Sequence, residues 1–178
     1  HPYTQKLLAA HATGVPDPVA PDAAEVLRCE HLRMWFPITS GFLRRTTGHV
    51  KAVNDANLSV RAGETLGVVG ESGSGKSTLL SCMAGHMAPD TGRVIFDTAS
   101  GPRDTVQMAE AERRRMARTD WAFVHQNPRD GLRMGVSAGG NVGERLMAVG
   151  ARHDDQIREA AVDWLGRVEI AADRVDDR

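Results

Sequence analysis

The chain has 178 residues, with 22 lysine and arginine residues against 23 aspartate and glutamate residues, and a net charge of −1. This length allows one ordinary domain with a hydrophobic core, or part of a larger one. The balanced charge excludes a general attraction to nucleic acid or to an anionic membrane, so any partner must be recognised by a local site, and we expect no nucleic-acid partner.

The two cysteines, Cys29 and Cys82, lie in contexts that lack metal-ligand or disulfide spacing. Cys82 stands in the apolar run LLSCMAG and is predicted to be a small buried packing residue. No apolar run approaches the roughly 20 residues that a membrane helix needs, and the N-terminus has no signal pattern. We therefore expect a cytoplasmic protein that serves a membrane, if at all, from its inner face.

The first third of the chain predicts a linker and three strands. Residues 14–22, GVPDPVAPD, contain three prolines and predict an extended linker. Residues 25–36 and 49–60 alternate in the manner of strands and are separated by a basic loop at 37–48. A short apolar run at 65–70, TLGVVG, then predicts a buried central strand.

The rest of the chain is predicted to be mostly helical. A helix that begins at Lys76 is expected to stop at Gly85, and RVIFD and WAFVHQ predict further strands. Further helices are expected over residues 110–118, 138–149 and 154–168. The last of these has one apolar face, predicted to be core, formed by Ile157, Ala161, Trp164, Leu165 and Val168.

Residues 70–78 read GESGSGKST and match the phosphate-binding pattern G-x-x-x-x-G-K-[ST] completely. Glycines let main-chain N–H groups turn inward around a phosphate, where a Cβ would intrude, and the following helix directs its positive dipole end at the same anion. A mere glycine-rich turn would not explain why a strand precedes the motif and a helix follows it. The predicted site consists of Gly70, Glu71, Ser72, Gly73, Ser74, Gly75, Lys76, Ser77 and Thr78.

Three side chains of this site have separate expected roles. Lys76 supplies a mobile cation for the outer phosphates, and Ser77 offers a hydroxyl to Mg²⁺. Thr78 is placed to bond an inner phosphate. The expected ligand is a nucleoside triphosphate with Mg²⁺.

The motif with its flanks resembles the nucleotide-binding subunits of ABC ATPases, in which GESGSGKST follows an antiparallel strand pair ending VRAGETLGVV. The resemblance implies an α/β fold, a P-loop NTPase of the ABC nucleotide-binding type, with ATP and Mg²⁺ as cofactors and a second ATPase subunit as dimer partner. It also implies that Gln126, in WAFVHQNP, contacts Mg²⁺ and the attacking water as a catalytic residue. Without the phosphate loop, Gln126 would be interpreted as a surface amide.

Residues 63–178 resemble a narrower group, the K subunits of the phosphonate carbon–phosphorus lyase system. The pattern HQNPRDGLR…VSAGGNVGERLMA.GARH carries this resemblance and is more specific than the phosphate loop. It implies an ATPase that docks on the lyase core complex, which breaks down phosphonates in the cytosol and releases phosphate.

The front of the chain resembles the ATPases of oligopeptide and dipeptide transporters instead. HPYTQKLLAA is similar to the end of one such unit, and FPITSGFLRRTTGHVKAVNDANLSVRAGETLGVVGESGSGKST to the start of the next. The implied organisation is a tail at 1–13, a linker at 14–22 and, over 23–178, the N-terminal portion of an ABC domain, with a helical insertion from about 105. This truncated portion would hold the β-subdomain, the Walker A helix and part of the helical subdomain. A fusion, a hybrid and a misassembled reading frame all remain open.

Several parts of the ABC pattern have no counterpart in this sequence. VSAGGN, at 136–141, is not interpreted as the LSGGQ signature, because a similar stretch of the lyase subunit precedes the true signature. The Mg²⁺-binding Asp, the catalytic Glu and the switch histidine are missing, and His125 is expected to be structural. Hydrolysis needs these groups and a second subunit's signature, so we expect this chain not to turn over ATP efficiently and to be a marginally stable fragment.

The family usually stacks an aromatic ring from the first hairpin on adenine. Thr47, nearest the usual place, is not aromatic, and Phe36 and Phe42 are the candidates. Packing or contact with a partner explains both rings equally well.

Three functions from different classes remain open. The chain could serve the phosphonate lyase assembly, couple ATP to an oligopeptide or dipeptide importer through a membrane permease, or bind nucleotide or a partner without hydrolysis. A small-molecule kinase with the same loop is less favoured, because those enzymes lack the long hairpin and the context of Gln126.

Overall fold

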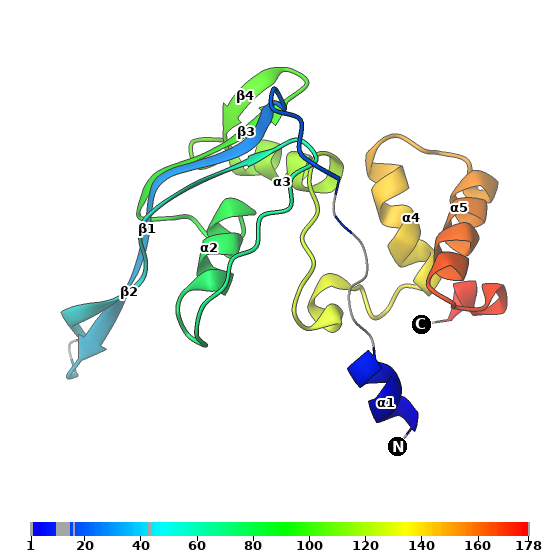
Figure 1. The fold of residues 1–178 in the computed structure, drawn as a ribbon, viewed down its shortest axis with the longest axis horizontal. Coiled ribbons are helices and arrows are strands. Elements are labelled where there is room, and N and C mark those ends of the chain that lie inside the picture. The colour runs from blue at the N-terminus through cyan, green and yellow to red at the C-terminus, as the bar shows by residue number, and fades with distance from the viewer. Residues whose placement is uncertain (1, 10–14, 16, 43, 178) are drawn as a thin grey trace.

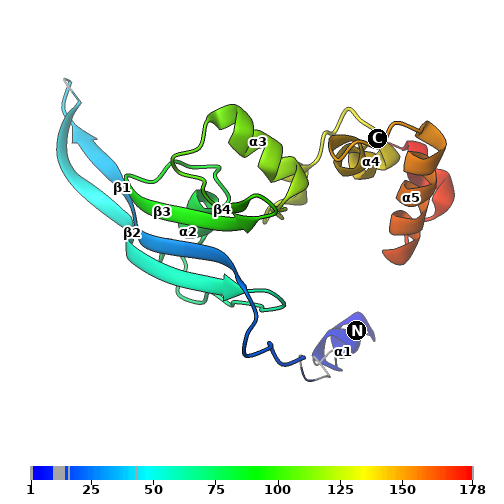
Figure 2. The same ribbon diagram turned by 90° about the horizontal axis from the view of Figure 1, so that it is seen from above.

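The computed structural model describes residues 2–9, 15, 17–42 and 44–177. A short helix, α1 (Pro2–Ala9), precedes an antiparallel sheet that packs on the helix of the phosphate loop. A separate group of helices follows. Figures 1 and 2 both place these helices at the opposite end of the molecule from the tip of the first hairpin.

The sheet has four antiparallel strands in the order β2-β1-β3-β4. They are β1 (Glu25–Ser40), β2 (Arg45–Arg61), β3 (Thr91–Thr98) and β4 (Gly101–Asp104). The strands predicted at 25–36, 49–60 and RVIFD are confirmed. The loop predicted at 37–48 is wrong, because pairing continues through Pro37↔His49 and Ile38↔Gly48 almost to the turn. Pro37 is tolerated there, since no third strand of the described residues pairs with β1 at that level.

The helix α2 (Lys76–Met83) covers one face of this sheet. Their shared core consists of Cys29, Leu32, Val53, Cys82, Met83 and Val94. The prediction that Cys82 is buried is confirmed, at 1% exposure. Gly85, with φ +73°, adopts the left-handed conformation just after the helix, so the expected stop is also confirmed.

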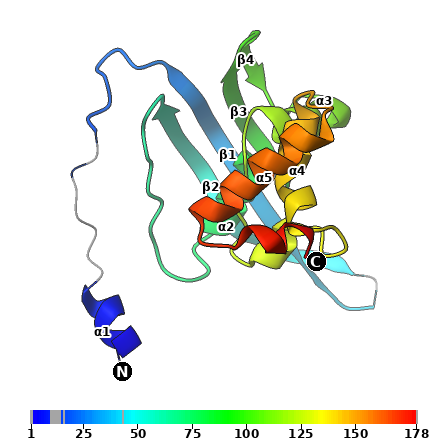
Figure 3. The same cartoon turned by 90° about the vertical axis from the view of Figure 1, so that its right-hand side faces the viewer.

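The remaining elements are helical. They are α3 (Glu110–Thr119), η1 (Pro128–Gly131), α4 (Ala138–Ala148), α5 (Asp154–Arg167) and η2 (Ala172–Asp176), and the three predicted helices are confirmed. The elements α4, α5 and η2 lie together (Figure 3). Their second core consists of Ala161, Leu165 and Val175, against which Ala138 and Val142 of α4 pack. The prediction that Trp164 and Val168 are core is wrong. Trp164 is 55% exposed and Val168 63%, and the Arg167 guanidinium lies 4.6 Å from the centre of the Trp164 ring.

The two predicted strands at 65–70 and 121–126 do not form. Both segments run without strand pairing, and Val69 and Val124 are 93% and 91% exposed. A buried strand of a mixed or parallel sheet requires neighbours on both sides, and among the described residues no strand lies beside either segment. Residues 65–70 therefore remain on the surface, whereas Trp121 and Phe123 of the second segment are half-buried.

None of the helices in the described part of the chain combines the length and the apolar character needed to cross a membrane.

Candidate functional site

The phosphate loop is held against the sheet by Gly75. This residue has φ +93°, and a Cβ placed on it would lie 1.9 Å from the carbonyl oxygen of Ala52 in β2. Gly73, at φ +80°, also has left-handed backbone, but a Cβ there would meet no atom within 4 Å. Two different requirements therefore select these glycines: Gly73 for its dihedral angle alone, Gly75 for both dihedral angle and space.

The start of α2 points free N–H groups toward the loop. The first intrahelical bond runs from the Leu79 N–H to the Gly75 carbonyl at 2.8 Å, so the N–H groups of Lys76, Ser77 and Thr78 precede the helical ladder. The first turn contains no acidic residue, and no side chain caps it. The positive end of the helix dipole is thus available to an anion.

The ammonium of Lys76 lies across the loop. Its Nζ donates to the carbonyl oxygens of Gly70 (2.9 Å) and Glu71 (2.6 Å) and to Ser74 Oγ (3.3 Å). The Ser74 N–H in turn donates to the Glu71 carbonyl at 3.2 Å, which closes a turn around Ser72. The loop therefore places one cation beside the start of the helix.

The hydroxyl groups of Ser77 and Thr78 make no hydrogen bond with the part of the chain that the structure describes. Ser77 is exposed and Thr78 is half-buried, both in the first turn of α2. A neutral hydroxyl oxygen is a hard donor of the kind that Mg²⁺ accepts alongside phosphate oxygens and water. These residues fit a magnesium–phosphate ligand.

Gln126 is not brought to this loop. Its side chain is exposed and makes no hydrogen bond with any described residue of 70–78. It follows the unpaired segment 121–125 and precedes η1, which Asn127 caps by accepting from the Arg129 N–H at 3.3 Å. Because no sheet aligns this segment with residues 65–70, nothing fixes Gln126 beside the phosphate site. Its catalytic role stays a prediction.

The candidate rings for adenine lie on the first hairpin. Phe36 is 37% exposed and Phe42 wholly exposed, while the Thr47 hydroxyl donates to the Ile38 carbonyl at 3.2 Å. Sequence reasoning missed Trp35, whose ring lies 4.5 Å from Lys51 Nζ. A signal existed, since Trp35 precedes Phe36 directly, but only the pairing Trp35↔Lys51 shows what it contacts.

His125 belongs to an aromatic cluster with His86 and Phe123. The two imidazole rings are stacked with centroids 5.8 Å apart, and Phe123 meets both edge-on. Burial, and secondarily the charge of His125, lowers the pKa of His86. These contacts support the structural role that was predicted for His125.

The stretch at 136–141 leads into the helix α4. Ser137 caps α4 by accepting from the Gly140 N–H at 3.2 Å. Asn141 Oδ1 accepts from the Arg133 N–H at 2.8 Å, and its Nδ2 donates to the carbonyls of Arg133, Val136 and Ser137, each at 3.1 Å. This geometry accounts for the Ser, Gly and Asn residues by capping and packing.

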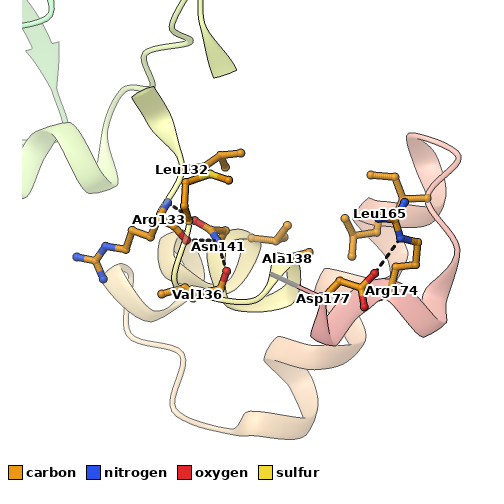
Figure 4. A pocket seen from close by; sticks show the side chains of 11 residues that line it. Leu132, Arg133, Val136, Ala138, Asn141, Leu165, Arg174 and Asp177 are labelled. Atoms are coloured by element: carbon orange, nitrogen blue, oxygen red, sulfur yellow. Dashed lines mark hydrogen bonds and ion pairs between the residues drawn. The ribbon is translucent and has the colours of Figure 1, made fainter. Parts of the chain in front are cut away.

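Beside this stretch lies a cavity of about 370 Å³ that sequence reasoning also missed (Figure 4). Its lining is mainly apolar and includes Leu132, Met134, Val142, Leu165 and Ile170. The ion pair between Arg174 and Asp177, at 2.9 Å, borders it. None of the phosphate-loop residues lines this cavity.

The relatives found by comparison with known sequences and named here are all described as ATP-binding proteins. The sequence profile of the ABC transporter family matches residues 53–178. The chain is 51% identical to a protein of Escherichia coli K12 described as putative phosphonates utilization ATP-binding protein PhnK, over 71% of this chain and 49% of that protein. It is 37% identical to the peptidoglycan transport ATP-binding protein YejF of Agrobacterium fabrum, over 82% of this chain and 26% of that protein. It is also 37% identical to the oligopeptide transport ATP-binding protein AppF of Bacillus subtilis, over 58% of this chain and 30% of that protein.

These shares mean that the chain spans about half the length of PhnK and about a quarter of YejF. Among solved structures, a dimeric ATP-binding cassette, MJ0796 bound to ADP and phosphate, matches 84% of this chain with a TM-score of 0.71 and 23% identity, over 60% of that chain. The cbiO1 protein of Clostridium perfringens matches 86% of this chain with a TM-score of 0.56 and 26% identity, over 53% of that chain. The predicted P-loop NTPase fold of the ABC type is confirmed.

Proposed function

This chain belongs to the ABC transporter family, and from that premise we propose that residues 70–78 bind ATP together with Mg²⁺. The observation that supports this most directly is the loop itself. Gly75 lies against Ala52 where no Cβ fits, and the free N–H groups of α2 begin at the next residue. A flexible surface turn would not need this approach to a strand.

The residues divide the work of holding a triphosphate. The N–H groups from Gly73 to Lys76 surround an inner phosphate, and the dipole of α2 stabilises its charge. Lys76 exchanges its bonds with the loop carbonyls for bonds to outer phosphate oxygens. Ser77 would be a magnesium ligand, and Mg²⁺ would neutralise charge on the phosphate tail. Thr78 donates its hydroxyl to an inner phosphate.

The binding proposal is tested by titrating the protein with Mg-ATP in a calorimeter. Lys76→Ala removes charge-assisted hydrogen bonds worth about 1.5–3 kcal/mol each, so affinity should fall on the order of 10-fold to 100-fold. Arg115→Ala is the matched control, because Arg115 is an exposed cation of α3 without an ion pair to any described residue. Equal affinity of parent and Lys76→Ala would refute the site.

We also propose that the whole protein hydrolyses ATP as one half of a dimer, with Gln126 orienting the attacking water. The relatives named as ATP-binding proteins and the dimeric cassette MJ0796 support this step. Gln126→Ala should then lower the turnover of the whole protein with little change in Mg-ATP affinity, because the glutamine would act on water rather than on the phosphates held by the loop. Loss of affinity matching that of Lys76→Ala would contradict this division.

For the system that the ATPase serves, phosphonate utilisation is the proposal we favour. It is supported by the identity of 51% with PhnK, higher than the 37% shared with YejF of Agrobacterium fabrum and with AppF. The protein would then dock on a phosphonate lyase core complex in the cytoplasm. The second candidate, a peptide importer, is supported by the match to AppF, which is named as an oligopeptide transport ATP-binding protein and is 37% identical over 58% of this chain.

Affinity purification of the tagged protein from its own cells, with and without detergent, separates the two systems. Co-purification of phosphonate lyase subunits without detergent supports the first. Recovery of a membrane permease only in detergent supports the second and would place the protein at the inner face of the membrane.

A further inference from the structure

The outer part of the first hairpin, residues 34–42 and 44–51, forms a two-stranded arm. Pairing between β1 and β3 ends at Arg33↔Thr91, whereas β1 and β2 remain paired as far as Ser40↔Arg45. Figure 2 shows the arm leaving the four-stranded sheet and bending away from the rest of the molecule. A two-stranded ribbon is only marginally stable in water on its own, so we expect this arm to bind another surface.

The arm carries charge of one sign. No aspartate or glutamate occurs from His31 to Asn54, while residues 34–51 include Arg44, Arg45 and Lys51. None of these three cations forms an ion pair with any described residue. In a chain whose net charge is −1, this is a local positive surface.

The same arm exposes a group of apolar side chains on one face. Phe36 is directly opposite Val50, and Ile38 follows Phe36 two residues later opposite Gly48, so all three apolar side chains share one face. Their exposures are 37%, 54% and 48%. At the turn beyond them, Phe42 is wholly exposed, and Arg44 and Arg45 come two and three residues later in the sequence.

We propose that this arm binds the surface of an anionic phospholipid bilayer, with Phe42 in the interface and Arg44 and Arg45 at the phosphate groups. The aromatic ring at the tip would reach the apolar acyl region of the bilayer, while the two cations, farther from the tip, would lie at the level of the negative headgroups. The arm carries only positive charges, which fits the uniformly negative surface of an anionic bilayer better than a protein surface, where charges of both signs are interspersed. The inference does not depend on phosphate binding at residues 70–78.

The test is co-sedimentation of the protein with vesicles of phosphatidylglycerol and phosphatidylcholine, and with vesicles of phosphatidylcholine alone. Binding should be confined to the anionic vesicles and weaken as salt is raised. R44Q/R45Q should lower the partition coefficient on the order of 25-fold, since each cation near such a surface contributes about 1 kcal/mol. The matched control is R115Q/R118Q, which removes two exposed arginines from α3 and should leave binding unchanged.

A second readout locates the tip. Phe42→Trp should gain a fluorophore that brominated phosphatidylcholine, mixed into the anionic vesicles, quenches on binding. The parent protein, with Trp35, Trp121 and Trp164, gives the background. No binding to anionic vesicles, or equal loss in both double variants, would overturn the proposal. If the protein binds the vesicles but the Trp at residue 42 is not quenched, the tip does not insert. If the protein does not bind vesicles, and a soluble protein co-purifies with it only when Arg44 and Arg45 are present, the arm binds a protein partner instead.

Discussion

The carbonyl oxygen of Ala52 occupies the space into which any side chain at Gly75 would project, at 1.9 Å from an ideal Cβ. One contact therefore joins the phosphate loop to the second strand of the hairpin. The left-handed φ of +93° at Gly75 adds a dihedral constraint to the steric one.

Gly75→Ala should abolish Mg-ATP binding, because either the loop or β2 must move to make room. The dihedral strain alone costs on the order of 1–3 kcal/mol, and the steric overlap adds to it. Gly73→Ala is the control, since Gly73 has φ +80° but open space around its Cβ position. Urea unfolding should show a larger stability loss for Gly75→Ala, and equal losses would contradict the close approach.

Substitution by alanine should change the stability in opposite directions at two glycines of the helical part. A Cβ on Gly143 of α4 would lie 2.5 Å from Ile157 Cγ2 of α5, so Gly143→Ala should destabilise the pair of helices. A Cβ on Gly166 of α5 would meet nothing within 4 Å, and Gly166→Ala should stabilise by about 0.5–1 kcal/mol through helix propensity. Thermal unfolding of both variants measures the difference, and a shift of the same sign in both would count against the packing described.

Asn141→Ala should loosen the chain before α4. Its amide makes hydrogen bonds to the main chain of Arg133, Val136 and Ser137, and a net value of about 1 kcal/mol for a typical bond predicts a loss of a few kcal/mol. Hydrogen exchange should report faster exchange of the Arg133 N–H, which donates to Asn141 Oδ1 at 2.8 Å. Asn57→Ala, on β2, is the control, and unchanged exchange at Arg133 in Asn141→Ala would show that the bond is not formed in solution.

His86 should titrate below the usual histidine range. Burial, followed by the charge of His125, lowers its pKa, so the folded state binds this proton less readily than the unfolded state. The corresponding stability is present above the usual pKa of about 6.5 and is lost as the pH falls through that value toward the folded pKa. NMR titration of the His86 ring measures the pKa. His125→Phe keeps an aromatic ring but removes the charge, so it should raise the pKa of His86 only in part, and a pKa above the usual range would refute the arrangement.

What could be predicted from the sequence depended on the range of the interactions involved. The phosphate loop and the helices at 110–118, 138–149 and 154–168 follow from local rules of dihedral preference, capping and spacing, and they appear close to where they were expected. The strand at 65–70 failed because its formation depends on strands elsewhere, not on its own apolar residues.

For the first hairpin the sequence predicted too little strand rather than too much. Gly, Pro and Arg residues at 37–48 predict a loop locally, yet cross-strand pairs such as Phe36↔Val50 extend the ladder through this region. Trp164 was misplaced because helical periodicity gives the apolar side of α5 but not its width, and only Ala161 and Leu165 reach the core. The loop at 70–75 and the start of α2 could thus be predicted from local sequence, whereas the absence of strand partners for residues 65–70 could not.

The Lys76 ammonium has three oxygen acceptors within its own loop. An incoming anion must therefore compete for a donor that is already satisfied, and it succeeds only if its oxygen atoms replace those acceptors. Chloride, with a single diffuse charge and no set of oxygens, would gain little from that exchange, whereas a polyphosphate tail would offer several oxygen acceptors at once. Selectivity among anions at this loop thus begins before any base or sugar is recognised.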